Sequence, residues 1–170
     1  APRWAPQWEV RGITRQEVDL TDAGAVRRLW RDLHPHVVVH CAAQSRTGPC
    51  QRDPAMARRI NVEATSILAE LAAEIPFLFF SSDQVFDGSK GWYAETDPVH
   101  PVNVYGETKV EAELFVLQNP RHSVIRVALN AGSSSTGDRS FVEDMRNSVK
   151  GGAMLTLFMN EFRCPLPAGM

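Results

Sequence analysis

HVVVHCAA, residues 36–43, is a continuous apolar run that ends in small residues. A strand has this pattern when both of its faces are buried, as in a parallel sheet. Outward along the chain, PFLFFSS (residues 76–82) is a second run of the same kind, and stretches of helical period precede and separate the two. This alternation predicts an α/β fold with a doubly wound, mostly parallel, Rossmann-like sheet in three layers, α/β/α.

The other elements extend this pattern toward both ends of the chain. Helices are expected after Thr21 or Asp22, after the cap formed by Asp53 and Pro54, and over roughly residues 105–117 and 139–150. Further strands are predicted for WEVRGI (8–13), QEVDL (16–20), HSVIRVA (122–128) and AMLTLFM (153–159). We expect one nucleotide-binding domain over residues 1–170.

Composition excludes several classes of function. A net charge of −2 over 170 residues provides no basic field for nucleic acid. No apolar run approaches the ~20 residues that span a bilayer, so no membrane partner is expected. The three cysteines lack CxxC spacing and the histidines lack metal-ligand spacing, which predicts no disulfide framework and no metal site. A cytoplasmic protein fits this pattern best.

NVYGETKVEAE, residues 103–113, places Tyr105 and Lys109 four positions apart at the expected start of a helix. Residues i and i+4 share one helix face, and an ammonium near a phenol lowers the pKa of the phenol toward the range of a general acid or base. Ser81 and Ser82 close the preceding strand and offer a hydroxyl for a carbonyl oxygen. The alternative is that Tyr105 caps a loop and Lys109 is solvated.

The surrounding sequence discriminates between these alternatives. SSDQVFDGSKGWYAETDPVHPVNVYGETKVEAE (81–113), followed by SVIRVALNAG and SFVEDM, resembles the extended short-chain dehydrogenase/reductases, and among them the dTDP-4-dehydrorhamnose reductase family. The resemblance runs from DLTD at Asp19 to NEFRCPLPA near the end. It implies that Ser82 helps to bind the carbonyl oxygen, that Tyr105 donates the proton, and that Lys109 holds the nicotinamide ribose.

The same resemblance implies a set of cofactor contacts. It places Asp19 and Leu20 near the adenine, lets the cofactor approach the backbone at Ala42 and Ala43, and gives Asn61 a supporting role from its helix. With Ser81 at the strand end, the full set of expected cofactor residues is Arg15, Asp19, Leu20, Ala42, Ala43, Asn61, Ser81, Tyr105 and Lys109.

The residues after Ser82 bear on the reaction. Dehydratases of this superfamily have Asp-Glu there, whereas this chain has Asp83-Gln84, and an amide cannot accept the proton in an elimination. Reductases of the family usually have tyrosine at the position of Gln84. Because this position is close to the sugar, the difference leaves the identity of the substrate sugar undetermined. Asp83, Gln84 and Asn130 are the candidate substrate contacts, together with the hydroxyls of Ser133 to Ser135. The alternatives are that Asp83 is a turn carboxylate and that the serine loop only caps the next helix.

The cofactor preference is read after WEVRGI, where Thr14 and Arg15 follow instead of an acid. Arginine suits a 2′-phosphate, which favours NADP(H) over NAD(H); the alternative is that Arg15 is a surface residue. The glycine-rich phosphate turn is absent from the sequence. Either the domain is incomplete at both ends or the pyrophosphate site has been lost.

Three functions remain. The leading hypothesis is an NADP(H)-dependent reductase of a nucleotide-linked 4-keto-6-deoxy sugar. The alternatives are a non-catalytic, nucleotide-binding regulatory subunit that resembles the methionine adenosyltransferase beta subunit, and a sugar-nucleotide epimerase. The expected partners are the nucleotide sugar and a second copy of the chain in a homodimer.

Overall fold

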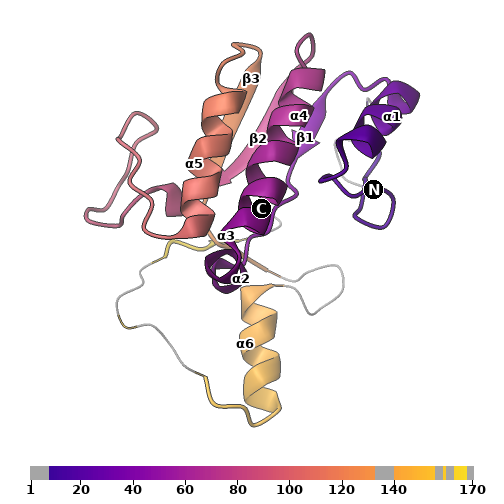
Figure 1. Ribbon diagram of the computed structural model, residues 1–170. Coiled ribbons are helices and arrows are strands. Elements are labelled where there is room, and N and C mark those ends of the chain that lie inside the picture. The colour runs from indigo at the N-terminus through magenta and orange to yellow at the C-terminus, as the bar shows by residue number, and fades with distance from the viewer. Residues whose placement is uncertain (1–7, 133–139, 156–158, 160–162, 168–170) are drawn as a thin grey trace.

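The computed structural model describes residues 8–132, 140–155, 159 and 163–167. Its main sheet has three strands in the order β1-β2-β3: Val38–His40, Phe77–Ser82 and His122–Val127. Both pairings are parallel, with Val38 opposite Phe77 and Phe77 opposite His122. Helices α4 (Ala64–Leu71) and α5 (Val104–Val116) connect these strands and lie side by side on one face of the sheet (Figure 1). The predicted α/β class is confirmed.

Local capping explains where most helices begin. Helix α1 (Ala23–Leu33) starts after Asp22, whose carboxylate accepts a hydrogen bond from the backbone N–H of Ala25. A short helix, α2 (Thr47–Arg52), precedes α3 (Pro54–Arg58), which starts at the predicted Asp53 cap. The helix then continues through a π-helical turn, η2 (Arg59–Glu63), into α4. A capping box of Ser140 and Glu143 opens α6 (Phe141–Lys150), which lies apart from the sheet in Figure 1.

The core lies between the sheet and the two helices on its face. Phe77 and Phe79 of β2 are completely buried. They pack against small side chains of α5 and of the end of α4, namely Ala112, Val116, Ala69 and Ala72. Alternate residues of a strand point to opposite faces, so Leu78 and Phe80 lie on the other face, where they are half-buried. The sheet is therefore held to α4 and α5, and this fixes α5 relative to the end of β2.

Two predicted strands near the N-terminus are wrong. Residues 8–13 and 16–20 form no strand. A strand needs a hydrogen-bonded neighbour, and among the described residues these segments have none. Residues 14–18 instead close a turn in which the carbonyl of Thr14 accepts hydrogen bonds from the N–H groups of Glu17 and Val18, and the Glu17 carboxylate accepts one from the N–H of Thr14.

Near the C-terminus, the described part of the predicted strand 153–159, residues 153–155 and 159, forms no strand, and residues 156–158 lie outside the described residues. A short parallel pair joins β4 (Asn130–Ala131) to β5 (Leu166–Pro167). Ser133 to Ser135 lie outside the described residues as well. The spacing of Val110, Leu114 and Leu117 suggests a stripe that packs in the core, and this interpretation is wrong, because Leu114 of α5 and Leu117 just after it are exposed. Within the described part of the chain, no helix has the length and apolarity to cross a membrane.

Candidate active site

The candidate site lies where β2 ends and α5 begins. Ser82 is the last residue of β2, and a 3-10 turn, η3 (Asp83–Val85), follows it. The Asn103 side chain caps α5 by accepting a hydrogen bond from the N–H of Gly106 at 2.9 Å. A Cβ atom at Gly106 would overlap the carbonyl oxygen of Gln84, so only glycine lets the helix start this close to the turn. This close approach brings Tyr105, the second residue of α5, next to the end of β2.

Tyr105 is 8% exposed, and the groups around it shift its pKa in opposite directions. Burial is the main cause that raises its pKa above the ordinary value, and the Ser82 hydroxyl acts in the opposite direction by hydrogen bonding. Asp83 and Cys50 raise the pKa further, whereas Arg163 lowers it. The prediction that Lys109 lowers the pKa of Tyr105 is therefore wrong for this structure. Burial is the largest influence on this pKa, and the Lys109 ammonium is bonded to the carbonyl of Phe80 instead.

Lys109 is 1% exposed and points toward the sheet. Its ammonium donates a hydrogen bond to the carbonyl oxygen of Phe80 at 2.7 Å and lies 3.9 Å from the centre of the Phe79 ring. Burial lowers its pKa to about 8, and the carboxylate of Glu113 partly opposes that shift. With a pKa of about 8, Lys109 is mostly charged at neutral pH but loses its proton more readily than an exposed lysine does.

Asn61 connects the end of β1 to α5. Its amide oxygen accepts a hydrogen bond from the N–H of Gln44 at 2.8 Å. Its NH₂ group donates to the carbonyl of Gln44 and, at 2.9 Å, to the hydroxyl of Thr108. Thr108 in turn donates to the carbonyl of Tyr105 at 2.7 Å. The buried asparagine thus supports the helix that carries Tyr105, and it does so from the π-helical turn η2.

Asp83 is held from a distant part of the chain. The guanidinium of Arg163 donates two hydrogen bonds to its carboxylate, at 3.0 and 2.8 Å, and the Ser82 hydroxyl donates a third at 3.1 Å. The neighbouring side chain of Gln84 accepts a hydrogen bond from Asn103 at 2.9 Å. Two candidate substrate residues therefore have fixed positions beside Ser82.

The remaining predicted residues lie in separate segments of the chain, and the first of these segments, residues 15–20, forms no strand. Arg15 and Asp19 form an exposed ion pair at 3.9 Å, and Asp19 also accepts hydrogen bonds from the N–H and hydroxyl of Thr21, which lower its pKa. Ser81 is buried, and its hydroxyl has no hydrogen-bond partner among the described residues. Of the other four predicted residues, Leu20 and Ala43 are half-buried and Ala42 is exposed. Asn130 is the first residue of β4.

The chain that carries this site matches a known protein family along almost its whole length. The family described as RmlD substrate binding domain matches residues 3–170. The chain belongs to the RmlD substrate binding domain family. The resemblance to dTDP-4-dehydrorhamnose reductases that was inferred from the sequence is thereby confirmed.

Relatives of this RmlD-family chain carry two different names. It is 38% identical to methionine adenosyltransferase 2 subunit beta of Bos taurus over 138 residues, 79% of this chain and 41% of the relative. It is 30% identical to dTDP-4-dehydrorhamnose reductase of Sinorhizobium fredii over 96% of this chain and 55% of that protein. The chain thus spans about half the length of the curated relatives it matches.

A solved structure supports the fold of this RmlD-family chain. The dTDP-4-dehydrorhamnose reductase of Bacillus anthracis, solved in complex with NADP, matches with a TM-score of 0.79 and 23% identity over 88% of this chain and 54% of its own. At this identity the match establishes the Rossmann-like fold and nothing finer.

Sequence reasoning missed several residues of the site. Thr108 and Gln44 are joined to Asn61, Cys50 lies near the Tyr105 phenol, and Arg163 binds Asp83. The spacing of Tyr105 and Lys109 indicates only that these two side chains share one face of a helix, and it gives no information about residues on other elements. Arg163 lies in NEFRCPLPA, which the resemblance included, but its partner is 80 positions away and no local pattern points to it.

Proposed function

We propose that this chain is the cofactor-binding part of an NADP(H)-dependent reductase that acts on a nucleotide-linked 4-keto-6-deoxy sugar. One observation carries the proposal: Ser82, at the end of β2, is close enough to the phenol of Tyr105 to lower its pKa, and the buried Lys109 lies one helical turn further along α5. This set of groups suits the reduction of a carbonyl that is bound outside the strand ends.

Each residue has a defined task in this reaction. The Ser82 hydroxyl donates a hydrogen bond to the carbonyl oxygen of the sugar, and Tyr105 transfers its phenolic proton to the same oxygen. The raised pKa of Tyr105 keeps the phenol protonated before the reaction. Bound NADPH supplies the hydride for the carbonyl carbon. Asp83 and Gln84, held by Arg163 and Asn103, position the sugar.

The residues present fit the nicotinamide end of this cofactor. The hydroxyl of Ser81, which has no hydrogen-bond partner in the described part of the chain, and the ammonium of Lys109 both lie at the end of β2, where they would hold the nicotinamide and its ribose. Arg15, whose side chain is 86% exposed, is available for a 2′-phosphate, which supports NADP(H) over NAD(H). No glycine-rich turn for the pyrophosphate occurs in the sequence. We place the protein in the cytoplasm, since its three cysteines are free thiols.

A second function is favoured by the relatives. The methionine adenosyltransferase 2 subunit beta of Bos taurus is 38% identical to this chain, against 30% for the Sinorhizobium fredii reductase. A regulatory subunit would keep the fold and the nucleotide pocket and act through a partner protein. A sugar-nucleotide epimerase, the third candidate, would interconvert two sugars without net consumption of NADPH.

Turnover by the complete gene product tests the proposal. We expect NADPH oxidation with dTDP-linked 4-keto-6-deoxy sugars, and a fall in kcat of about 100-fold or more in Tyr105→Phe with NADPH binding unchanged. If no keto sugar is reduced although NADPH binds, the reductase proposal fails. Recovery of one stoichiometric protein partner from the source cells would then support the regulatory subunit, and sugar interconversion at constant NADPH would support the epimerase.

A further inference from the structure

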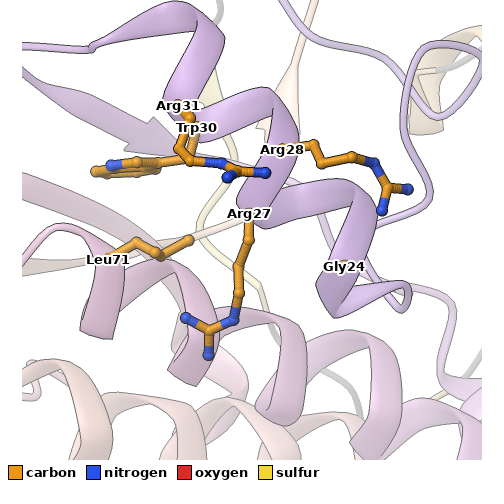
Figure 2. A pocket seen from close by; sticks show the side chains of 6 residues that line it. All are labelled: Gly24, Arg27, Arg28, Trp30, Arg31 and Leu71. Carbon is orange, nitrogen blue, oxygen red and sulfur yellow. The ribbon is translucent and has the colours of Figure 1, made fainter.

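A basic hollow lies between α1 and α4, away from the site at Ser82 and Tyr105. Its volume is about 540 Å³, within the range of small-molecule sites. Figure 2 shows that most of its lining comes from α1, with one side chain from the end of α4. The lining residues are Gly24, Arg27, Arg28, Trp30, Arg31 and Leu71.

The arginines of this hollow are incompletely neutralised. Arg27 pairs with Glu70 of α4 at 3.3 Å. Within the described part of the chain, Arg28 and Arg31 have no ion-pair or hydrogen-bond partner. Like charges three and four positions apart on a helix repel each other and destabilise it. An anion in the hollow would remove this repulsion and would meet planar groups that donate two parallel hydrogen bonds.

Gly24 lies beside the guanidinium group of Arg28. A Cβ atom on Gly24 would lie 3.3 Å from Nη1 of Arg28 and 3.2 Å from Oδ1 of Asp22. The Asp22 carboxylate is the nearby acid, and it already accepts the capping hydrogen bond from Ala25. Gly24 is the second residue of α1, and glycine is a poorer helix former than alanine. At this position the glycine leaves room for Arg28 to fold back over the helix start.

The rest of the lining is apolar. Trp30 is half-buried and packs with one side against the core, and Leu71 is half-buried on the facing helix. Side chains of this kind hold flat apolar groups, and indole rings stack on aromatic ligands. We propose that the hollow is a second ligand site, for a small aromatic molecule that carries a phosphate group: the ring packs between Trp30 and Leu71, and the phosphate binds Arg28 and Arg31.

Phenyl phosphate is the probe, titrated into the complete gene product with saturating NADPH present. Binding is followed by NMR at the indole N–H of Trp30, which is assigned with Trp30→Phe. The double variant Arg28→Gln/Arg31→Gln should bind at least ten-fold more weakly. Arg146→Gln, which changes an exposed arginine of α6, is the matched control and should bind as the native protein does. Gly24→Ala should weaken binding while thermal stability is kept or raised.

Three further titrations separate the sources of binding. Inorganic phosphate alone should bind more weakly than phenyl phosphate, because it lacks the ring. The proposal is overturned if phenyl phosphate leaves the Trp30 signal unmoved, or if the double variant binds it as tightly as the native protein. It is also overturned if benzyl alcohol binds as tightly as phenyl phosphate, since binding would not need the charge. Binding of a polyglutamate peptide without binding of phenyl phosphate would assign the hollow to a protein partner instead.

Discussion

Replacing Lys109 by methionine should separate the stability of this protein from its cofactor binding. Lys109 is 1% exposed, and burial lowers its pKa from 10.5 to about 8. The shift from 10.5 to about 8 corresponds to roughly 3 kcal/mol at 1.36 kcal/mol per unit. At pH 7 the ammonium is charged in both the folded and the unfolded chain, so the folded state bears this whole penalty.

Methionine removes the cost of burying the ammonium, but it also removes a hydrogen-bond donor. The carbonyl oxygen of Phe80 loses its 2.7 Å donor, which costs about 1–3 kcal/mol. The two effects nearly cancel at pH 7.5, where we expect the variant to be as stable as the native protein to within about 1–2 kcal/mol. Above pH 8 the folded native protein releases the Lys109 proton before the unfolded chain does, so its stability rises with pH. Between pH 7.5 and 9.5 the native protein should gain about 2 kcal/mol on the variant.

Denaturant unfolding of the complete gene product at the two pH values measures this difference. Burial raises the pKa of the Cys41 thiol above its ordinary value and the Lys109 charge opposes that shift, so both proteins carry Cys41→Ala. Lys90→Met is the control, because it makes the same substitution at an exposed lysine, one that pairs with Asp97. A constant difference between native protein and Lys109→Met would refute the reasoning. In the same variant, NADPH affinity should fall at least ten-fold if Lys109 holds the ribose.

Three other outcomes follow from the packing and the charges. Gly106→Ala should destabilise the protein by about 1–3 kcal/mol in urea unfolding and lower kcat/KM, because its Cβ overlaps the Gln84 carbonyl; a neutral variant would contradict the tight contact. Glu113→Ala should lower the free energy of unfolding by about 3 kcal/mol, because the Arg126 guanidinium loses the carboxylate to which it donates three hydrogen bonds. A loss below about 1 kcal/mol would contradict this, since that is the value expected for an exposed ion pair. Burial lowers the pKa of His40 to about 4, so stability should be lost as pH falls from 6.5 toward 4, by about 3 kcal/mol in total, and a His40→Gln variant should show a smaller loss.

Local chemistry made much of this fold predictable. Asp22 and Asp53 cap helices at the predicted positions because a cap needs only its own side chain and the next three residues. The apolar runs around Val38, Phe77 and Val124 became strands because an apolar segment of that length is buried wherever the sheet forms. Helix α5 was predicted from about residue 105 and begins at Val104, although the sequence alone did not identify Asn103 as its cap.

What the sequence could not predict depends on partners that are distant along the chain. WEVRGI has the composition of a strand, but a strand exists only beside another strand, and residues 8–13 have no such neighbour among the described residues. The π-helical turn at Asn61 gives no periodic signal, because it changes the helical phase by a single residue. Arg163 meets Asp83 across 80 positions, and this contact is set by the packing of the whole domain.

The protonation of Tyr105 bears on the choice among the candidate reactions. Burial raises its pKa, and the Asp83 carboxylate raises it further, so the phenol keeps its proton at neutral pH. A reductase needs a tyrosine that starts as an acid, whereas an epimerase that oxidises and then reduces its substrate needs the same tyrosine first as a base. Arg163 lowers the pKa of Tyr105 and binds Asp83, so Arg163→Gln should leave the Asp83 charge uncompensated and raise the pKa of Tyr105 further. The alkaline limb of the reduction rate should then move to higher pH. An alkaline limb that moved to lower pH would assign the proton transfer to a different group.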